Sequence, residues 1–175
     1  PDSYRIAPVI YCTVAESQSI AQEKAALIES LAKPIDTLAL LSEALNFDFG
    51  SKAMDDPFSD EELASISGLH AIRDRVIRAS GKRNPTVADF VTYSGRGTVK
   101  EIPHFIGTPE RVADELQAWF EGRACDGFVL AATHVPGAYE EFVRLVVPEL
   151  QRRGLHQNDY QGTTLRENLG LPGFL

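Results

Sequence analysis

The feature that most constrains this chain is an alternation of short apolar segments with helix-forming segments. The apolar segments predict three β-strands, at Arg5–Cys12, His104–Gly107 and Phe128–Ala132. A helix-forming segment follows each of them. Strand–helix repetition of this kind is typical of a parallel sheet covered by helices, so the sequence predicts an α/β fold, either doubly wound or part of a barrel.

Two of the predicted helices have clear boundaries. The first runs from Ala15 to Leu31, and Pro34 is its stop signal. The residues expected on its buried side are Ile20, Lys24, Leu27, Ile28 and Leu31, with the Lys24 amine reaching outward. The second begins with Thr108 as the N-cap and Pro109 at the first helical position. Its buried stripe is expected to be Val112, Leu116, Trp119 and Phe120.

The middle of the chain, residues 33–100, reads as a helical insertion. Its predicted helices are Thr37–Leu45, Glu61–Ala79 with a break near Gly68, and Thr86–Tyr93. Insertions in barrels often cover the site as mobile lids, so a lid is expected here. A further helix from Gly137 should kink or divide at Pro148, and residues 155–175 are expected to form an extended tail over the surface.

Three parallel strands make an incomplete domain. Both borders of such a sheet would be open, whereas parallel sheets are normally covered and have more strands. We therefore expect that further barrel units precede this chain, or that the chain self-associates. Pro8 cannot donate a hydrogen bond to a neighbouring strand, which predicts a bent or edge position for the first strand.

Composition excludes some classes of partner. With 17 basic against 25 acidic residues, the net charge of −8 disfavours nucleic acid and, more weakly, a membrane surface. Cys12 and Cys125 lie far apart and show no metal-ligand spacing, so we expect free thiols, no metal and a reducing, cytoplasmic location.

Several segments carry a resemblance to a known family. Ile106–Leu116 (IGTPERVADEL) and Asp126–Leu130 (DGFVL) look like the final repeats of bacterial-luciferase-like flavin-dependent monooxygenases. Phe142–Leu155 (FVRLVVPELQRRGL) and Tyr160–Leu171 (YQGTTLRENLGL) resemble the branch that holds the nitrilotriacetate monooxygenase component A and the dibenzothiophene-sulfone monooxygenase.

The resemblance implies a fold and a reaction. The fold would be the C-terminal three βα units, six to eight, of a luciferase-like (β/α)₈ TIM barrel, so that residues 1–175 are the C-terminal portion of one barrel domain. The implied reaction uses reduced FMN, supplied by a separate and transiently bound flavin reductase, and O₂ to oxygenate a small organic substrate such as an aminopolycarboxylate or an organosulfur compound. A homo-oligomer is also expected.

Two other functions stay open beside the oxygenase. One is a non-catalytic flavin-binding or structural luciferase-like protein. The other is a deazaflavin-dependent reductase of the same superfamily, which the tail segment disfavours. The 175-residue chain by itself, without the preceding barrel units, is expected to be inactive.

Candidate site residues follow from barrel geometry, because barrel sites lie where the strands end. His134 directly follows the third strand and is the candidate catalytic group, with Thr133 beside it as a substrate contact. A solvated loop histidine is the competing interpretation.

Further candidates would bind cofactor or shape the substrate pocket. Tyr11 would border the flavin, Thr108 would hold an anion at a helix start, and Arg96 would clamp an anionic group. Phe47 and Phe49 would line an apolar pocket beneath the lid. The alternative for Tyr11, Phe47 and Phe49 is ordinary packing. For Thr108 it is an ordinary N-cap, and for Arg96 it is a position in a solvated loop.

Overall fold

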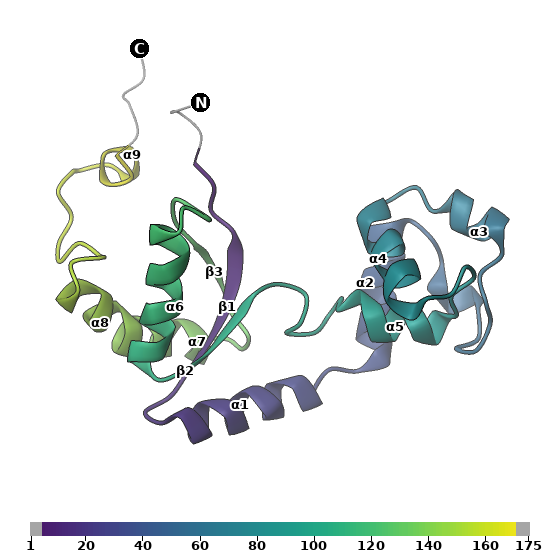
Figure 1. Cartoon of the computed structure of the whole chain (residues 1–175), viewed down its shortest axis with the longest axis horizontal. Helices are drawn as coiled ribbons and strands as arrows, with labels where there is room; N and C mark the ends of the chain where they lie inside the picture. The colour runs from purple at the N-terminus through teal and green to yellow at the C-terminus, as the bar shows by residue number, and fades with distance from the viewer. Residues whose placement is uncertain (1–4, 171–175) are drawn as a thin grey trace, which may run out of the picture. The chain divides into compact units, whose positions relative to one another are not determined.

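A computed structural model describes residues 5–170, and the chain divides into two compact units (Figure 1). The first unit contains Pro1–Pro8, Cys12–Gln22 and Phe105–Leu175, and the second contains Val9–Tyr11 and Glu23–His104. Residues 171–175, which end the predicted tail and include the last residue of its family-like segment, lie outside the described part, as does Pro1.

The sheet has three parallel strands in the order β2-β1-β3. These are β1 (Val9–Val14), β2 (His104–Gly107) and β3 (Val129–Ala131). The second strand matches its predicted bounds, and the α/β class is confirmed. The hydrogen bond from Ala15 N to Gly107 O (3.2 Å) joins β1 to β2, and that from Val129 N to Pro8 O (2.9 Å) joins β1 to β3.

Pro8 was expected to give the first strand a bent or an edge position, and the edge position is wrong. β1 lies in the centre of the sheet, because the strand begins at Val9 and Pro8 stands one residue before it. Pro8 contributes its carbonyl oxygen to Val129, and that bond does not need the N–H that proline lacks. The third strand was expected to be buried on both faces, but Val129 is 50% exposed because β3 is an outer strand.

Helix α1 (Gln18–Ser30) buries a neighbouring part of its surface and not the centre of the predicted side, of which Ile28 is half-buried. Ala21 and Ala25 are buried, whereas Ile20, Leu27 and Leu31 are 52–66% exposed. The small alanine side chains allow close packing on one side, and the larger side chains stay uncovered.

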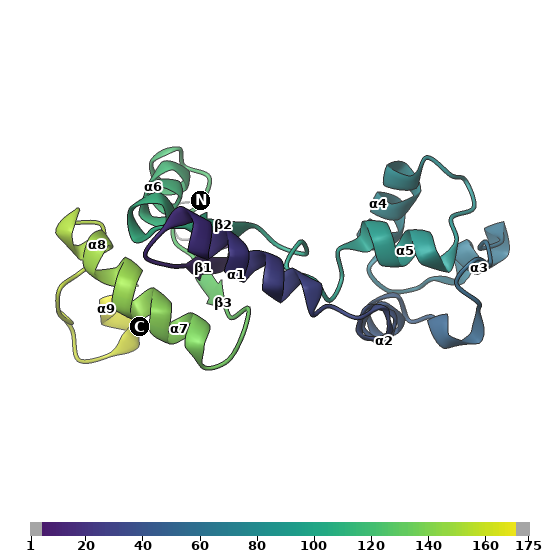
Figure 2. The same ribbon diagram turned by 90° about the horizontal axis from the view of Figure 1, so that it is seen from below.

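Helix α6 (Pro109–Glu121) follows β2, as predicted. Val112 and Leu116 are buried, Trp119 is half-buried and Phe120 is exposed. The chain after β3 forms α7 (Gly137–Glu141), a π-helical turn (Phe142–Val146) and α8 (Val147–Arg152). Figure 2 shows α7 and α8 as one continuous rod. The wide turn lies directly before Pro148, whose missing N–H cannot continue the regular bonding pattern, so the helix is modified but not broken.

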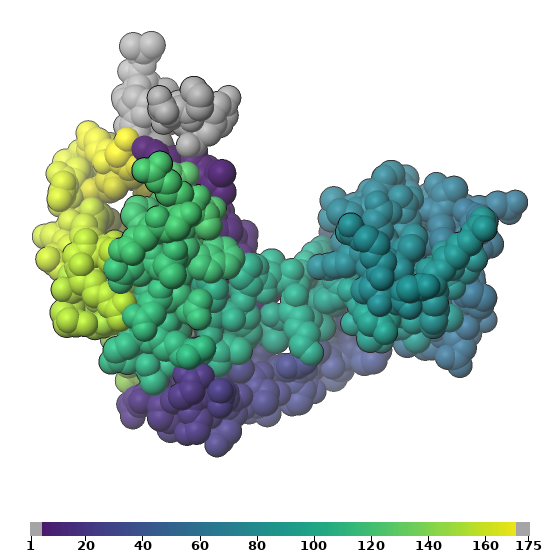
Figure 3. Space-filling view, in the orientation of Figure 1, coloured from purple at the N-terminus to yellow at the C-terminus, as the bar shows by residue number. Residues whose placement is uncertain are grey.

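The described tail has its own hydrogen-bonded structure. α9 (Leu165–Asn168) is capped by Thr164, and the Asn168 side chain accepts from Gly162 N (2.9 Å) and donates to Gly162 O (3.0 Å). In Figure 3 the tail (yellow) stands out from the rest of the first unit, so it does not lie flat on the surface as the polar sequence suggested.

The second unit is helical. It contains α2 (Pro34–Leu45), a 3₁₀ turn (Phe49–Ser51), α3 (Asp60–Ser65), α4 (His70–Ser80) and α5 (Val87–Ser94). Pro34 occupies the start of α2, so it begins a helix as well as ending the preceding one. Ser59 and Glu62 form a reciprocal capping box at α3, and Thr86 and Asp89 form another at α5.

An aromatic core holds the helical unit together. Phe49, Phe58 and Phe90 are at most 1% exposed, and their ring centroids lie 4.8–5.5 Å apart. Gly68 separates α3 from α4, as the predicted break required. A Cβ at this position would stand 2.0 Å from Ala44 O, so only glycine permits the approach to the backbone of α2.

Candidate functional site

The carboxyl end of β2 is closed by its own neighbours. Thr108 is the N-cap of α6, and its hydroxyl accepts from Arg111 N (3.4 Å). A Cβ on Gly107 would stand 2.7 Å from Arg111 Cδ and 2.8 Å from Gln18 Oε1, so glycine leaves room for both side chains. Gln18 Nε2 also donates to Ile106 O (3.4 Å). No pattern in the sequence indicated this packing of Gln18.

The carboxyl end of β3 leads to a more open polar group. Thr133 Oγ1 lies 3.1 Å from His134 Nδ1, and His134 O accepts from Ala138 N at the start of α7 (3.2 Å). Both side chains are half-buried. The Cα of Gly137 faces the imidazole so closely that a Cβ would stand 2.8 Å from Nε2. A half-buried imidazole with one nitrogen engaged can donate or accept through the other.

Tyr11 and Arg96 belong to a different group of residues. Tyr11 lies within β1 and not after it, because the strand continues to Val14. Its ring meets that of His104 edge-on, with centroids 5.9 Å apart. Arg96 pairs with Glu101, which also accepts from Gly97 N (3.2 Å). Arg96 is therefore already neutralised by a carboxylate of its own loop.

Electrostatics in this second group follow from burial. Burial raises the pKa of the Tyr11 hydroxyl, the nearby Glu101 carboxylate raises it further, and Arg96 lowers it in part. Burial also lowers the pKa of His104, which the carboxylate of Glu29 offsets in part. Both effects favour neutral side chains here.

Phe47 and Phe49 face the core of the helical unit. Their ring centroids are 5.5 Å apart, and both rings contact Phe58. Phe49 is fully buried and Phe47 packs against the same cluster. The structure thus brings Thr108, Thr133 and His134 into the first unit, and it places Tyr11, Arg96, Phe47 and Phe49 in the second.

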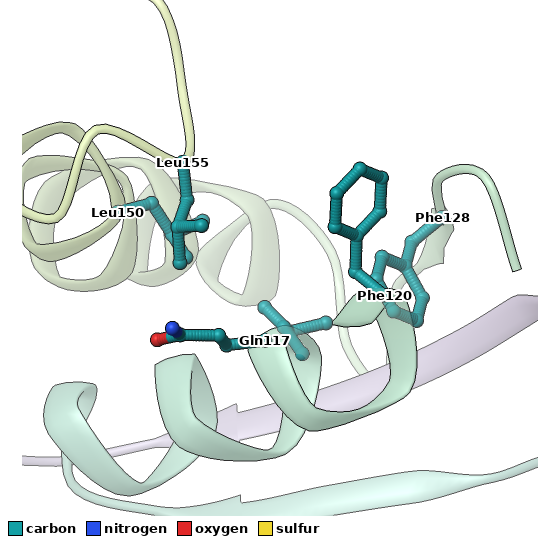
Figure 4. A pocket seen from close by; sticks show the side chains of 6 residues that line it. Gln117, Phe120, Phe128, Leu150 and Leu155 are labelled. Atoms are coloured by element: carbon teal, nitrogen blue, oxygen red, sulfur yellow. The ribbon is translucent and has the colours of Figure 1, made fainter. Parts of the chain in front are cut away.

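An apolar cavity of about 110 Å³ lies between α6 and the junction of α8 with the tail (Figure 4). Leu150 and Leu155 face α6 across it, and Phe120 and Phe128 close one end. Sequence reasoning did not identify it, because its wall combines residues from α6, the segment before β3, α8 and the tail. A polar cavity of about 240 Å³ adjoins the tail and is lined by Gln151, His156, Gln157, Asn158, Asp159 and Tyr160.

Among residues 5–170, no three histidine, cysteine, aspartate or glutamate side chains are placed to hold a metal ion. None of the helices described is long and apolar enough to cross a bilayer. The packing at the end of β2 already engages Gly107 and Thr108, whereas Thr133 and His134 form a half-buried polar pair after β3. The imidazole of His134 can donate or accept one further hydrogen bond through Nε2.

Comparisons with known proteins give a consistent result. No family model matches the chain. It is 35% identical over 179 residues to the dibenzothiophene-sulfone monooxygenase of Rhodococcus erythropolis, covering 98% of this chain and 38% of that protein. It is 33% identical over 172 residues to the nitrilotriacetate monooxygenase component A of Aminobacter aminovorans, covering 97% of this chain and 37% of that protein.

A solved structure agrees with these relatives. Riboflavin lyase, determined with a modified FMN and riboflavin, superposes with a TM-score of 0.69 at 26% identity, over 97% of this chain and 36% of that one. The chain thus spans just over a third of the length of the proteins it matches.

Proposed function

We propose that this chain forms the last three βα units, six to eight, of an FMN-dependent two-component monooxygenase. The chain is a homologue of the C-terminal part of luciferase-like monooxygenases. The supporting observation is similarity to two proteins named as monooxygenases over 97–98% of the chain. The whole protein would receive reduced FMN from a separate flavin reductase and oxygenate a small organic substrate. Organosulfur compounds and aminopolycarboxylates are the candidate classes, since these relatives are named for a sulfone and for nitrilotriacetate.

Within this proposal the flavin supplies the reaction with oxygen, and the protein positions the substrate and excludes water. His134 would donate a proton or a hydrogen bond at the carboxyl end of β3, with Thr133 beside it. Thr108 would border the same edge of the sheet, although its hydroxyl already caps α6. Tyr11, Arg96, Phe47 and Phe49 stay predictions for cofactor or substrate contacts. Arg96 already pairs with Glu101, and Phe47 and Phe49 pack in the core of the helical unit.

Isotope incorporation tests the proposal. The full-length protein, a flavin reductase, NADH and FMN are incubated under ¹⁸O₂ with dibenzothiophene sulfone or nitrilotriacetate, and products are analysed by mass spectrometry. A product carrying one ¹⁸O atom supports a monooxygenase. Binding of reduced FMN without any labelled product from a broad panel of both substrate classes would favour the non-catalytic alternative.

The role of His134 is tested by His134→Gln. Loss of a proton donor lowers turnover by about 10²- to 10⁴-fold in typical cases. We expect a reduction in that range, with little change in FMN affinity. The matched control is His156→Gln, since His156 is an exposed tail residue beside the polar cavity. Equal turnover in the two variants would refute the catalytic assignment.

A further inference from the structure

Thr133, Gly137 and Ala138 lie around His134, and we call this group the seat of its imidazole ring. Thr133 Oγ1 lies 3.1 Å from Nδ1, and the main-chain oxygen of His134 accepts from Ala138 N (3.2 Å). The first contact engages one edge of the ring, and the second fixes the backbone to which the ring is attached. One contact therefore holds the ring, and the other holds the backbone that carries it.

Gly137 supplies the third side of the seat. An added Cβ there would stand 2.8 Å from Nε2 and 3.0 Å from Cδ2 of His134. The φ angle of Gly137 is not in the left-handed region, so backbone conformation does not require glycine at this position. Glycine is required here because the imidazole ring occupies the space that a Cβ would fill. Because the crowded atoms are at the end of a side chain, an alanine would displace the ring and leave the helix start in place.

We propose that Thr133 and Gly137 are positioning residues for His134, which hold its neutral ring in the tautomer with the proton on Nε2. The inference deepens the proposed function and rests on it. The Thr133 hydroxyl can donate to Nδ1, which leaves the ring proton on Nε2, at the edge of the ring that faces Gly137. In the opposite tautomer the Nδ1–H would donate to Thr133, and Nε2 could act only as an acceptor.

Nuclear magnetic resonance tests the tautomer without reference to activity. Full-length protein labelled with ¹⁵N-histidine is compared with the Thr133→Val and Thr133→Ser variants, and His134→Gln assigns the signals. The wild type and Thr133→Ser should show one Nε2–H population, and Thr133→Val should show mixed tautomers. A mixed or Nδ1–H population in the wild type, or no change in Thr133→Val, would overturn the proposal.

The Gly137→Ala variant tests the seat, and Gly127→Ala is its matched control because a Cβ at Gly127 meets nothing within 4 Å. Gly137→Ala should shift the His134 ring signals and lose the single tautomer, while its backbone amide spectrum shows the fold retained. Unchanged ring signals would contradict the role of Gly137.

Turnover separates this inference from the proposed function. Thr133→Val should lower turnover about 10-fold, the factor that a loss of about 1.4 kcal/mol produces, and Thr133→Ser should restore it. A changed tautomer with unchanged turnover would support the positioning role and count against catalysis by His134.

Discussion

At the scale of single residues, Cys12 shows how position decides reactivity. It lies in the central strand with 4% of its surface exposed, and burial raises the pKa of its thiol to about 12. The thiolate is the reactive form of cysteine, so its population at neutral pH is very small. Cys12 is thus a core side chain of the sheet.

We predict that Cys12 resists alkylation in the folded protein. In a Cys125→Ser variant, iodoacetamide at pH 8 should leave Cys12 unmodified, whereas unfolding in urea should make it react at the rate of a free thiol. Mass spectrometry of the intact protein measures both. Fast modification under native conditions would show that β1 opens or that the thiol is not buried.

At the scale of elements, one arginine joins α8 to α6. Arg153 Nη1 lies 2.7 Å from Asp114 Oδ1, Nη2 donates to Glu110 O (3.2 Å), and Nε lies 2.7 Å from Glu149 Oε1. Hydrogen bonds from Arg152 and then Arg153 lower the pKa of Glu149 from 4.5 to about 2. The Glu149 carboxylate thereby orients the guanidinium that connects the two helices.

The linkage predicts an acid-dependent stability. The pKa of Glu149 is lower in the folded than in the unfolded chain, so its stabilisation is fully present above about pH 4.5 and is lost as the pH falls towards 2. Glu149→Gln should lower the free energy of unfolding at pH 7, and the difference from wild type should narrow between pH 4.5 and 2. Urea denaturation at several pH values measures it. The control is Glu140→Gln, an exposed position of α7; a pH-independent difference for Glu149→Gln would refute the linkage.

At the scale of the whole molecule, the sheet is open at both sides in the described chain. β2 and β3 are its outer strands, and Val129 on β3 is 50% exposed. Helix α1 adds the exposed side chains of Ile20, Leu27 and Leu31. Open parallel strands and uncovered apolar side chains favour association with further structure.

We therefore predict that residues 1–175, expressed alone, self-associate. Size-exclusion chromatography with light scattering should give a mass above that of one chain. Val129→Lys should reduce association, because a charge on an outer strand disfavours edge pairing. The matched control is Val143→Lys, which changes an exposed valine of the π-helical turn and not of a strand. A monodisperse monomer that unfolds cooperatively would contradict the prediction.

Periodicity and capping signals determined much of the local structure. Thr108 with Pro109 correctly marks the start of α6, and Gly68 correctly marks the break before α4. These features could be predicted because a cap or a helix break depends on a few neighbouring residues.

Tertiary structure decided which side of each helix is buried and which elements pack against each other. The buried side of α1, the central position of β1 and the burial of Phe49 among the helices each needed contacts distant in sequence. For the candidate site, the sequence selected His134 and Thr133 by their place after a strand, but the space at Gly137 emerged only from coordinates. Hydrophobicity predicts that a side chain is buried, but only the packing of the folded chain determines which residues it contacts.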